Sequence, residues 1–324
     1  MDPLNTQFAS GPFEVQTRLT QIAQAAMPSG LIADDVCPRV RTGYKFTYTT
    51  LSEEDLLTIP DVRASRAGRL NQVEFGAMDT TASVVDFGLE DPVPSRDIEE
   101  AQAQEVAYDP LEQAAISTAE LVRLARERRV ADLVTTASNY AAGHSATLNG
   151  NAQWSHANAN PRKVILEALD VPLVRPNVLV FGQKVWTALR QHPKIVEAVA
   201  ATGAGDQASG IVVKEAVAEL FEVDRVLVGM AWYQSAKRGQ EDSFARLWGK
   251  HACAIHVRRD MASARDRMPK FCWTADALGG LQVGTYEEPA RGVNRGSTVV
   301  KVSECVKELV AYGRAGYLWR NAVA

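Results

Sequence analysis

The segment between residues 35 and 95 most constrains the fold, because it cannot be stable by itself. Residues 44–50 alternate aromatic and β-branched side chains with period two, which predicts a strand, and residues 82–87 are predicted to be its partner. Between them lies a polar stretch of roughly thirty residues, far longer than a hairpin loop of two to five. A two-stranded hairpin alone is only marginally stable in water. We therefore expect a projecting loop that rests on something else, with a neighbouring copy of the chain as one option.

Charged side chains mark this projecting loop. Glu53 and Glu54 precede three arginines, Arg63, Arg66 and Arg69. Adjacent carboxylates do not converge on one substrate as paired acid and base groups do, so the two glutamates are read as surface. Exposed ion pairs contribute about 0–1 kcal/mol each, so such contacts matter mainly when they are repeated. We predict that all five residues contact an adjacent subunit.

The strongest helix signal begins at Asp109 and runs to about residue 140. Asp109 can cap the helix, Pro110 suits the first helical position, and Glu112 has the spacing of a capping box. Apolar residues then recur on one face: Leu111, Ala115, Ala119, Val122, Val130, Leu133 and Ala137. At 1.5 Å per residue such a helix would be ~45 Å long, enough to cross a domain.

The same helix carries a run of charged residues that includes Arg123, Arg126 and Arg129. A solvated helix face explains this run, and a contact with a partner or with DNA is the alternative. The sequence leaves both explanations open. We take these three arginines as candidates for a partner-facing or DNA-facing surface.

The remaining chain predicts a mixed body without repeats. A short helix is expected in residues 1–34, with Val15, Leu19, Ile22 and Ala26 on one stripe. Beyond residue 160 strands and helices alternate. The expected strands are 177–181, 225–232, 251–257 and 298–302, and the expected helices are 162–169, 182–191, 214–221 and 304–310. This pattern indicates an α+β protein with a mixed α/β part.

The chain offers no recognisable chemical site. The glycines between residues 203 and 210 miss the spacing of a dinucleotide-binding loop, and there is no P-loop. His251 and His256 are five residues apart on a predicted strand, so they would point to opposite faces. The cysteines, Cys37, Cys253, Cys272 and Cys305, form no CxxC pair. We therefore expect no catalytic residue, no metal site and no cofactor.

Composition narrows the choice of partners. Dedicated nucleic-acid-binding proteins usually carry a net positive charge, whereas this chain has a formal net charge of -4. No apolar stretch approaches the ~20 residues that span a bilayer, so no membrane partner is expected. The start of the chain does not resemble a signal peptide, and scattered cysteines fit a reducing compartment. We expect a protein that is made in the cytoplasm.

Several short segments, taken in order, resemble the major capsid proteins of tailed bacteriophages. They are residues 176–182, 185–193, 219–223, 226–229 and 247–250, followed by 316–318 near the end. The implied fold is the Hong Kong ninety-seven type, which encapsulin shells share. It implies an N-terminal arm (1–34), an E-loop (35–95), a peripheral domain with the spine helix (96–174, completed in part by C-terminal strands), an axial domain (175–315) and a C-terminal segment (316–324).

The resemblance also implies a function and partners. Copies of the chain would form hexamers and pentamers in an icosahedral shell, synthesised in the host bacterial cytoplasm and located in the virion. The shell would enclose double-stranded DNA non-specifically. A separate scaffolding protein, a portal protein and an optional decoration protein are the implied partners. Some members carry a covalent lysine–asparagine crosslink, but Lys45 is the only lysine of this E-loop and lies at its base, so we predict none here.

Two other functions fit parts of the pattern. An encapsulin-like compartment has the same fold and would load protein cargo. A soluble α/β enzyme with an unrecognised site belongs to a different class, and it would run as a small oligomer in size-exclusion chromatography. Decoration and tail proteins fit less well, because they do not explain a long helix together with an extended loop.

Overall fold

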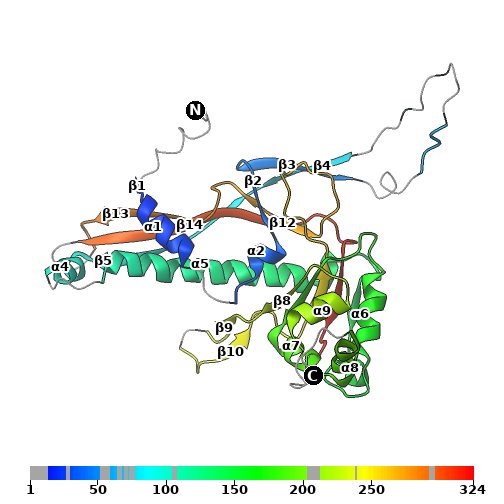
Figure 1. The fold of residues 1–324 in the computed structure, drawn as a ribbon. Helices are drawn as coiled ribbons and strands as arrows, with labels where there is room; N and C mark the ends of the chain where they lie inside the picture. The colour runs from blue at the N-terminus through cyan, green and yellow to red at the C-terminus, as the bar shows by residue number, and fades with distance from the viewer. Residues whose placement is uncertain are drawn as a thin grey trace.

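The computed structural model describes residues 14–26, 30–51, 59–63, 68, 72, 77–103, 108–202, 212–237, 239–291 and 296–324. These residues form two larger sheets, which meet at one long helix, and two hairpins that project from the body (Figure 1).

The helices are α1 (Thr17–Ala25), α2 (Ala33–Val36), α4 (Ser95–Ala103), α5 (Pro110–Thr135), α6 (Pro161–Leu169), α7 (Gln183–Leu189), α8 (Pro193–Thr202) and α9 (Lys214–Leu220), with 3-10 turns η1 (Ala137–Asn139) and η2 (Gly150–Ala152). The strands are β1 (Glu14–Val15), β2 (Arg39–Arg41), β3 (Lys45–Leu51), β4 (Ala77–Ser83), β5 (Val85–Pro94), β6 (Ser145–Thr147), β7 (Val178–Gly182), β8 (Arg225–Gly229), β9 (Trp232–Gln234), β10 (Phe244–Arg246), β11 (Ala252–Ile255), β12 (Cys272–Asp276), β13 (Gln282–Glu288), β14 (Ser297–Val310) and β15 (Gly316–Arg320).

A six-stranded sheet lies along the long helix α5, and we call it the peripheral sheet (Figure 1). Its order is β1–β13–β14–β12–β2, and β5 also pairs with the central strand β14. Alternate side chains of a strand face opposite sides of a sheet. Val300 and Val302 of β14 therefore point the same way, and they share one core with Ala115, Ala119 and Val122 of α5. Sheet and helix thus form two packed layers.

Strand β5 forms an outer edge of the described part of this sheet. It pairs with β14 from Val85↔Val306 to Pro94↔Ser297. The N–H of Ser95 donates to the carbonyl of Gly296 at 3.3 Å. Backbone N–H and C=O groups alternate in direction along a strand. Since Ser95 directs its N–H toward β14, the even-numbered residues of β5 direct their N–H and C=O groups away from β14. Pro92 and Pro94 are among them, as expected for prolines at a sheet edge.

The second sheet, in the order β6–β15–β11–β7–β8, forms an axial body together with α6, α7, α8 and α9. Strand β7 is buried along its whole length, and it separates two cores. Phe181 faces the core that α6 to α9 cover, while Val180 packs in a core with Val130 and Val134 near the end of α5. The last turns of α5 therefore lie against the axial body.

Two antiparallel hairpins project from these layers (Figure 1). In the first, β3 pairs with β4 from Lys45↔Ser83 to Leu51↔Ala77. The rings of Phe46 and Tyr48 contact Trp273 of β12 at centroid distances of 5.7 and 6.2 Å, which anchors the hairpin base. The second hairpin, β9–β10, leaves the axial body below α5.

The predicted start of the long helix is confirmed. The carboxylate of Asp109 accepts hydrogen bonds from the backbone N–H groups of Leu111 (3.0 Å) and Glu112 (3.4 Å), and Pro110 occupies the first turn. The helix ends at Thr135 rather than near residue 140, and the turn η1 follows.

Other predicted elements differ from the structure. The partner of β3 is β4, whereas residues 85–87 belong to β5 in the peripheral sheet. Residues 304–310 are not a helix but the second half of β14. Glu304 and Glu308 have helical spacing, but both also have even numbers, so the strand presents both toward α5, where an arginine binds them. The strand predicted for 225–232 is divided, because β8 ends at Gly229.

Both sheets combine strands from different predicted segments. Strands β12, β13 and β14 fall within residues 175–315, yet they pair with β2, β1 and β5 in the peripheral sheet. Strand β6, from the segment 96–174, instead pairs with β15 in the axial body. These long-range pairings carry no local sequence signal.

Candidate functional site

Arg123, the first of the three arginines predicted to face a partner or DNA, is turned toward the chain itself. It donates to the carbonyl oxygens of Ala23 (2.6 Å), Gln24 (3.3 Å) and Ala26 (2.5 Å), at the C-terminal end of α1. A cation at this position meets the negative end of the helix dipole. Arg123 therefore holds α1 on α5.

Arg126 is buried, with 2% of its surface exposed. Its guanidinium pairs with Asp34 on α2 and donates to the hydroxyl of Thr274 (3.0 Å) and the carbonyl of Cys37 (3.3 Å). Burial raises the pKa of Asp34, but the charges of Arg126 and Arg39 outweigh burial, so the pKa lies below its usual value. The pair ties α2 to α5 and β12.

Arg129 and Arg39 bind the carboxylates of β14 and β12. Arg129 contacts Glu304 at 2.9 Å and Glu308 at 3.1 Å. Arg39 contacts Glu304 at 3.0 Å and Asp276 at 3.2 Å. Burial lowers the pKa of Arg39, but the nearby carboxylates, led by Asp34, outweigh it and raise the pKa. These charges form one network between α5 and the peripheral sheet.

The network corrects the expected position of the arginines. Arg126 has almost no surface to offer a partner, and Arg123 and Arg129 are half-buried against their own chain. The physical reason is that α5 is covered on more than one side, so several of its charged residues need internal partners. Helical spacing alone could not show how many sides are covered.

Glu127 lies beside this network and is fully buried, with 0% of its surface exposed. Its carboxylate accepts from the backbone N–H groups of Ile32 (3.0 Å) and Ala33 (2.7 Å) and from the indole nitrogen of Trp248 (2.6 Å). Burial raises the pKa of Glu127, although these hydrogen bonds oppose the shift. One side chain of α5 thus holds both the start of α2 and a residue of the axial body.

Two glycines make room for Trp248 and its neighbour. A Cβ atom at Gly229 would lie 1.9 Å from Cδ1 of Trp248, and a Cβ atom at Gly182 would lie 2.5 Å from the carbonyl oxygen of Gly249. Real Cβ atoms do not come so close, so the indole ring can occupy this position only beside glycine. Glu127 was not recognised in the sequence, where it appears as one more charge in the helix, and Trp248 entered only as part of the segment 247–250 that carries the resemblance.

The β3–β4 hairpin carries the residues predicted to contact another subunit. Arg63 is exposed, and its N–H donates to the carboxylate of Asp61 at 3.0 Å. Arg66, Arg69, Glu53 and Glu54 lie outside the described residues. Ile59 and Val62, which no sequence pattern marks, are 93% and 84% exposed. The hairpin extends away from both sheets (Figure 1).

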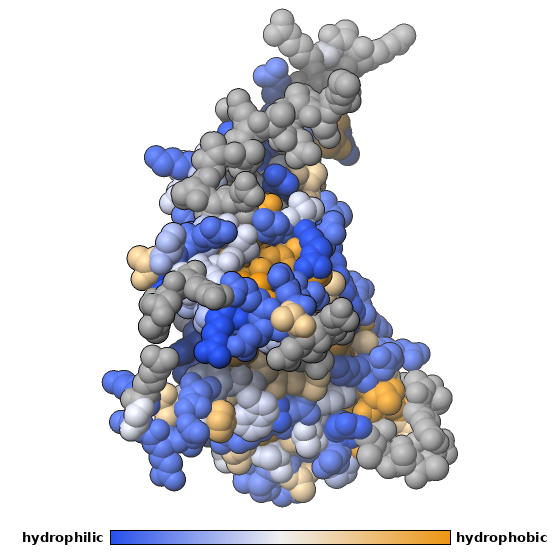
Figure 2. All heavy atoms as spheres, turned by 90° about the vertical axis from the view of Figure 1, so that its left-hand side faces the viewer, coloured by the Kyte–Doolittle hydropathy of each residue, from blue (hydrophilic) through white to orange (hydrophobic). Residues whose placement is uncertain are grey.

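A groove of about 620 Å³ runs beside the edge strand β5. It is lined by Asp86, Glu90, Lys301 and Ser303, among others. Lys301 and Ser303 have odd numbers, so they lie on the face of β14 opposite to the face that packs on α5. Viewed from the adjoining end of the molecule, the surface is mainly hydrophilic, and apolar atoms form separate small patches (Figure 2). The groove itself also has apolar lining residues, among them Val15, Tyr44 and Leu89, so a contact there would combine charged and apolar groups.

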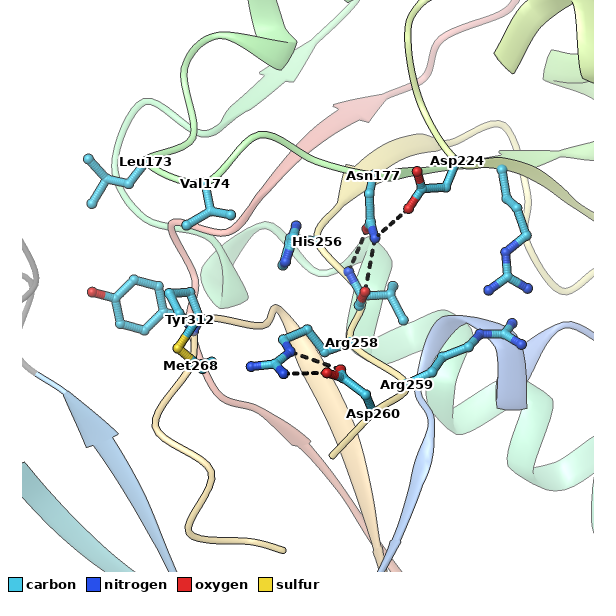
Figure 3. Close-up of a pocket in the computed structure, with 13 residues that line it drawn as sticks. Leu173, Val174, Asn177, Asp224, His256, Arg258, Arg259, Asp260, Met268 and Tyr312 are labelled. Atoms are coloured by element: carbon cyan, nitrogen blue, oxygen red, sulfur yellow. Dashed lines mark hydrogen bonds and ion pairs between the residues drawn. The ribbon is translucent and has the colours of Figure 1, made fainter. Parts of the chain in front are cut away.

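A second cavity, of about 700 Å³, lies where the axial body meets β14 (Figure 3). Asn177 donates to the carboxylate of Asp224 at 3.1 Å, and Arg258 pairs with Asp260 at 2.6 Å. The wall also contains apolar side chains, including Leu173 and Met268. Ligand pockets have similar volumes, but here these polar groups pair with each other rather than converging on the space.

The described residues hold no group of three or more His, Cys, Asp or Glu that could bind a metal ion. The four cysteines are free and buried, as expected for cysteines that act as small apolar side chains. Burial raises the pKa of the Cys253 thiol to about 12. In the part of the chain that the structure describes, no helix combines the length and the apolarity needed to cross a membrane.

Comparison with known sequences identifies relatives over nearly the whole chain. A family model described as phage major capsid protein E matches residues 135–243. The major capsid protein of Pseudomonas phage JBD67 is 39% identical over 317 residues, which cover 98% of this chain and 99% of that protein.

Solved structures share the fold. A phage-related protein from Bordetella bronchiseptica RB50 is 23% identical with a TM-score of 0.74, and the match covers 96% of this chain and 99% of that chain. The capsid structure of cyanophage P-SCSP1u is 11% identical with a TM-score of 0.55, and the match covers 97% of this chain and 93% of that chain. The chain has the Hong Kong ninety-seven type fold and belongs to the family of phage major capsid proteins, the structural proteins of the virion shell.

Proposed function

We infer that this chain assembles with copies of itself into hexameric and pentameric rings, which close into an icosahedral shell around double-stranded DNA. The observation that carries this proposal is the β3–β4 hairpin, which extends from the body and exposes Ile59 and Val62 almost completely. A long two-stranded projection has little core of its own. A neighbouring subunit would supply the surface that the hairpin lacks, and a heterologous contact of this kind forms rings when its rotation closes.

We place the charged part of this contact on the groove beside β5. Arg63, Arg66 and Arg69 would meet the acidic side chains Asp86 and Glu90 of the neighbour, and Glu53 and Glu54 would lie at the rim. Opposite charges favour this arrangement. Each exposed pair adds only about 0–1 kcal/mol, so the gain comes from repetition around every ring.

The experiment that tests the proposal is deletion of residues 53–70 in the full chain. We expect a folded chain, shown by circular dichroism, that forms no shells in electron micrographs under conditions in which the unchanged chain does. Normal shells from the deleted chain would contradict the proposal. A charge exchange makes the contact specific: Glu90→Arg should impair assembly, and adding R63E should restore it in part.

Other partners remain part of the same proposal. A separate scaffolding protein and a portal protein would direct assembly, and a decoration protein would be an optional addition to the finished shell. The net charge of -4 suits a wall that encloses DNA without binding it tightly. Co-expression with the neighbouring gene products, followed by electron microscopy of the particles, tests whether closed shells depend on them.

A further inference from the structure

The β9–β10 hairpin has two different faces. Trp232 pairs with Arg246, Tyr233 with Ala245, and Gln234 with Phe244. Directly opposed residues point to the same side of a hairpin, and consecutive residues point to opposite sides. Trp232 and Phe244 therefore share one face with Arg246, and Tyr233 lies on the other.

The Tyr233 face is turned toward the chain itself. The guanidinium of Arg128 on α5 lies 5.0 Å from the centre of the Tyr233 ring. Such a contact between a cation and a ring is attractive. It holds the hairpin at a defined position below α5 (Figure 1).

The base of the hairpin is also fixed. The N–H of Met230 donates to the carbonyl of Gly30 at 3.4 Å, and the N–H of Leu247 donates to the carbonyl of Ala231 at 3.0 Å. Gly229 precedes Met230, and Trp248 follows Leu247. The ring of Trp248 lies directly over Gly229. The hairpin is therefore a positioned projection rather than a loose loop.

The opposite face exposes aromatic surface. Trp232 is 50% exposed and Phe244 is 63% exposed. Arg246 lies over one face of the Trp232 ring, 4.2 Å from its centre, and donates to the carbonyl of Met230 at 2.9 Å, so it holds the ring in place while half of the Trp232 surface stays exposed. Large aromatic side chains bury 150–250 Å² when they are covered, so these two partly exposed rings offer roughly 200 Å².

The size of this face favours one kind of partner. A stable interface needs about 800 Å² on each side, so the hairpin alone would hold a free protein only weakly. The same area adds strongly to a partner that another contact already keeps close. A copy of this chain that is held through the β3–β4 hairpin meets that condition. It is also present in equal number, which allows every hairpin of a shell to be covered.

We propose that the Trp232–Phe244 face of the β9–β10 hairpin is a second contact surface between copies of this chain. It rests on the proposed assembly into shells, but it uses a different hairpin from the contact proposed above. It adds an apolar, aromatic contact to an interface whose other part is charged.

Site-specific photo-crosslinking tests this surface in assembled particles of the full chain. We expect p-benzoylphenylalanine at position 244 to give a covalent dimer of the chain on irradiation, identified by mass spectrometry. The same group at position 233 is the matched control. It lies one strand away and faces α5, so it should react within its own chain.

The outcomes separate this surface from the assembly proposal. If intact shells give no dimer from position 244, or give only a product with a different protein, this inference is wrong while the shell proposal stands. If the unchanged chain forms no shells even when it is co-expressed with the neighbouring gene products, the shell proposal itself fails.

Thiol labelling gives a second measurement should the photoreactive chain fold poorly. The native cysteines are buried, so Phe244→Cys provides a single accessible thiol. We expect its maleimide labelling to be about tenfold slower in shells than in the unassembled chain. Equal labelling rates in the two states would overturn the inference.

Discussion

The indole nitrogen of Trp248 donates a 2.6 Å hydrogen bond to the buried carboxylate of Glu127. This contact joins the axial body to the middle of α5, and the same carboxylate holds the start of α2. Three parts of the chain that are distant in sequence therefore depend on one side chain.

Replacing Trp248 by phenylalanine should destabilise the chain by about 1–3 kcal/mol, because the buried carboxylate loses a donor while a ring remains. The measurement is the urea midpoint of the unassembled chain. Trp232→Phe is the matched control, since its indole is exposed, and it should change the midpoint little. Equal effects of the two variants would show that the hydrogen bond contributes nothing specific.

The raised pKa of Glu127 predicts a pH dependence with a definite sign. Between the ordinary value of 4.5 and the higher pKa in the folded chain, the folded state keeps a proton that the unfolded state has released. The contribution of the Glu127 carboxyl group to the free energy of unfolding is therefore fully present below pH 4.5, and it decreases as the pH rises. Glu127→Gln removes the titration.

Urea unfolding of both proteins across this pH range checks the prediction. The difference in unfolding free energy, native chain minus Glu127→Gln, should decrease as the pH rises above 4.5. A difference that stays constant, or that increases, would contradict it.

Gly229→Ala should destabilise the junction by about 1–3 kcal/mol, because the new methyl group forces the Trp248 ring out of its position. The change should also shift the tryptophan fluorescence of the folded chain. Gly43→Ala is the control: its Cβ atom would lie 3.4 Å from the carbonyl of Lys45, an ordinary contact. Similar losses in both variants would mean that the close approach at Gly229 is not responsible.

Arg129→Met should cost about 3–5 kcal/mol, because it leaves Glu304 buried without one of its two cations and removes a partner of Glu308. Arg96→Met breaks an exposed pair with Glu100 and should have little effect. Adding Glu304→Gln to Arg129→Met should recover part of the loss. The prediction fails if the double variant is as unstable as the sum of the two single changes.

Local signals predicted the parts of the fold that depend on local interactions. Asp109 and Pro110 fixed the start of α5 because capping and proline geometry involve only neighbouring residues. The alternation in residues 44–50 predicted β3 for the same reason. The partner strand was predicted at residues 82–87, but the tertiary fold pairs β3 with residues 77–83 and places residues 85–87 in another sheet.

The candidate site was much less predictable. Arg126 and Glu127 are adjacent charged residues in a helix, and their sequence pattern is that of a solvated face. Their burial follows from α2, β12 and Trp248, which come from three remote parts of the chain. Residues 304–310 were predicted to be a helix, but they belong to β14, and a spacing of four residues, as between Glu304 and Glu308, fits both a helix face and one side of a strand.

The prolines of β5 have a consequence for a chain that works among many copies of itself. An open strand edge can recruit an edge from another molecule and lead to uncontrolled stacking. Pro92 and Pro94 remove two donors where such an added strand would have to bind. Many copies can then be close together without pairing their sheets edge to edge. Contacts between neighbouring copies are then formed by side chains and hairpins.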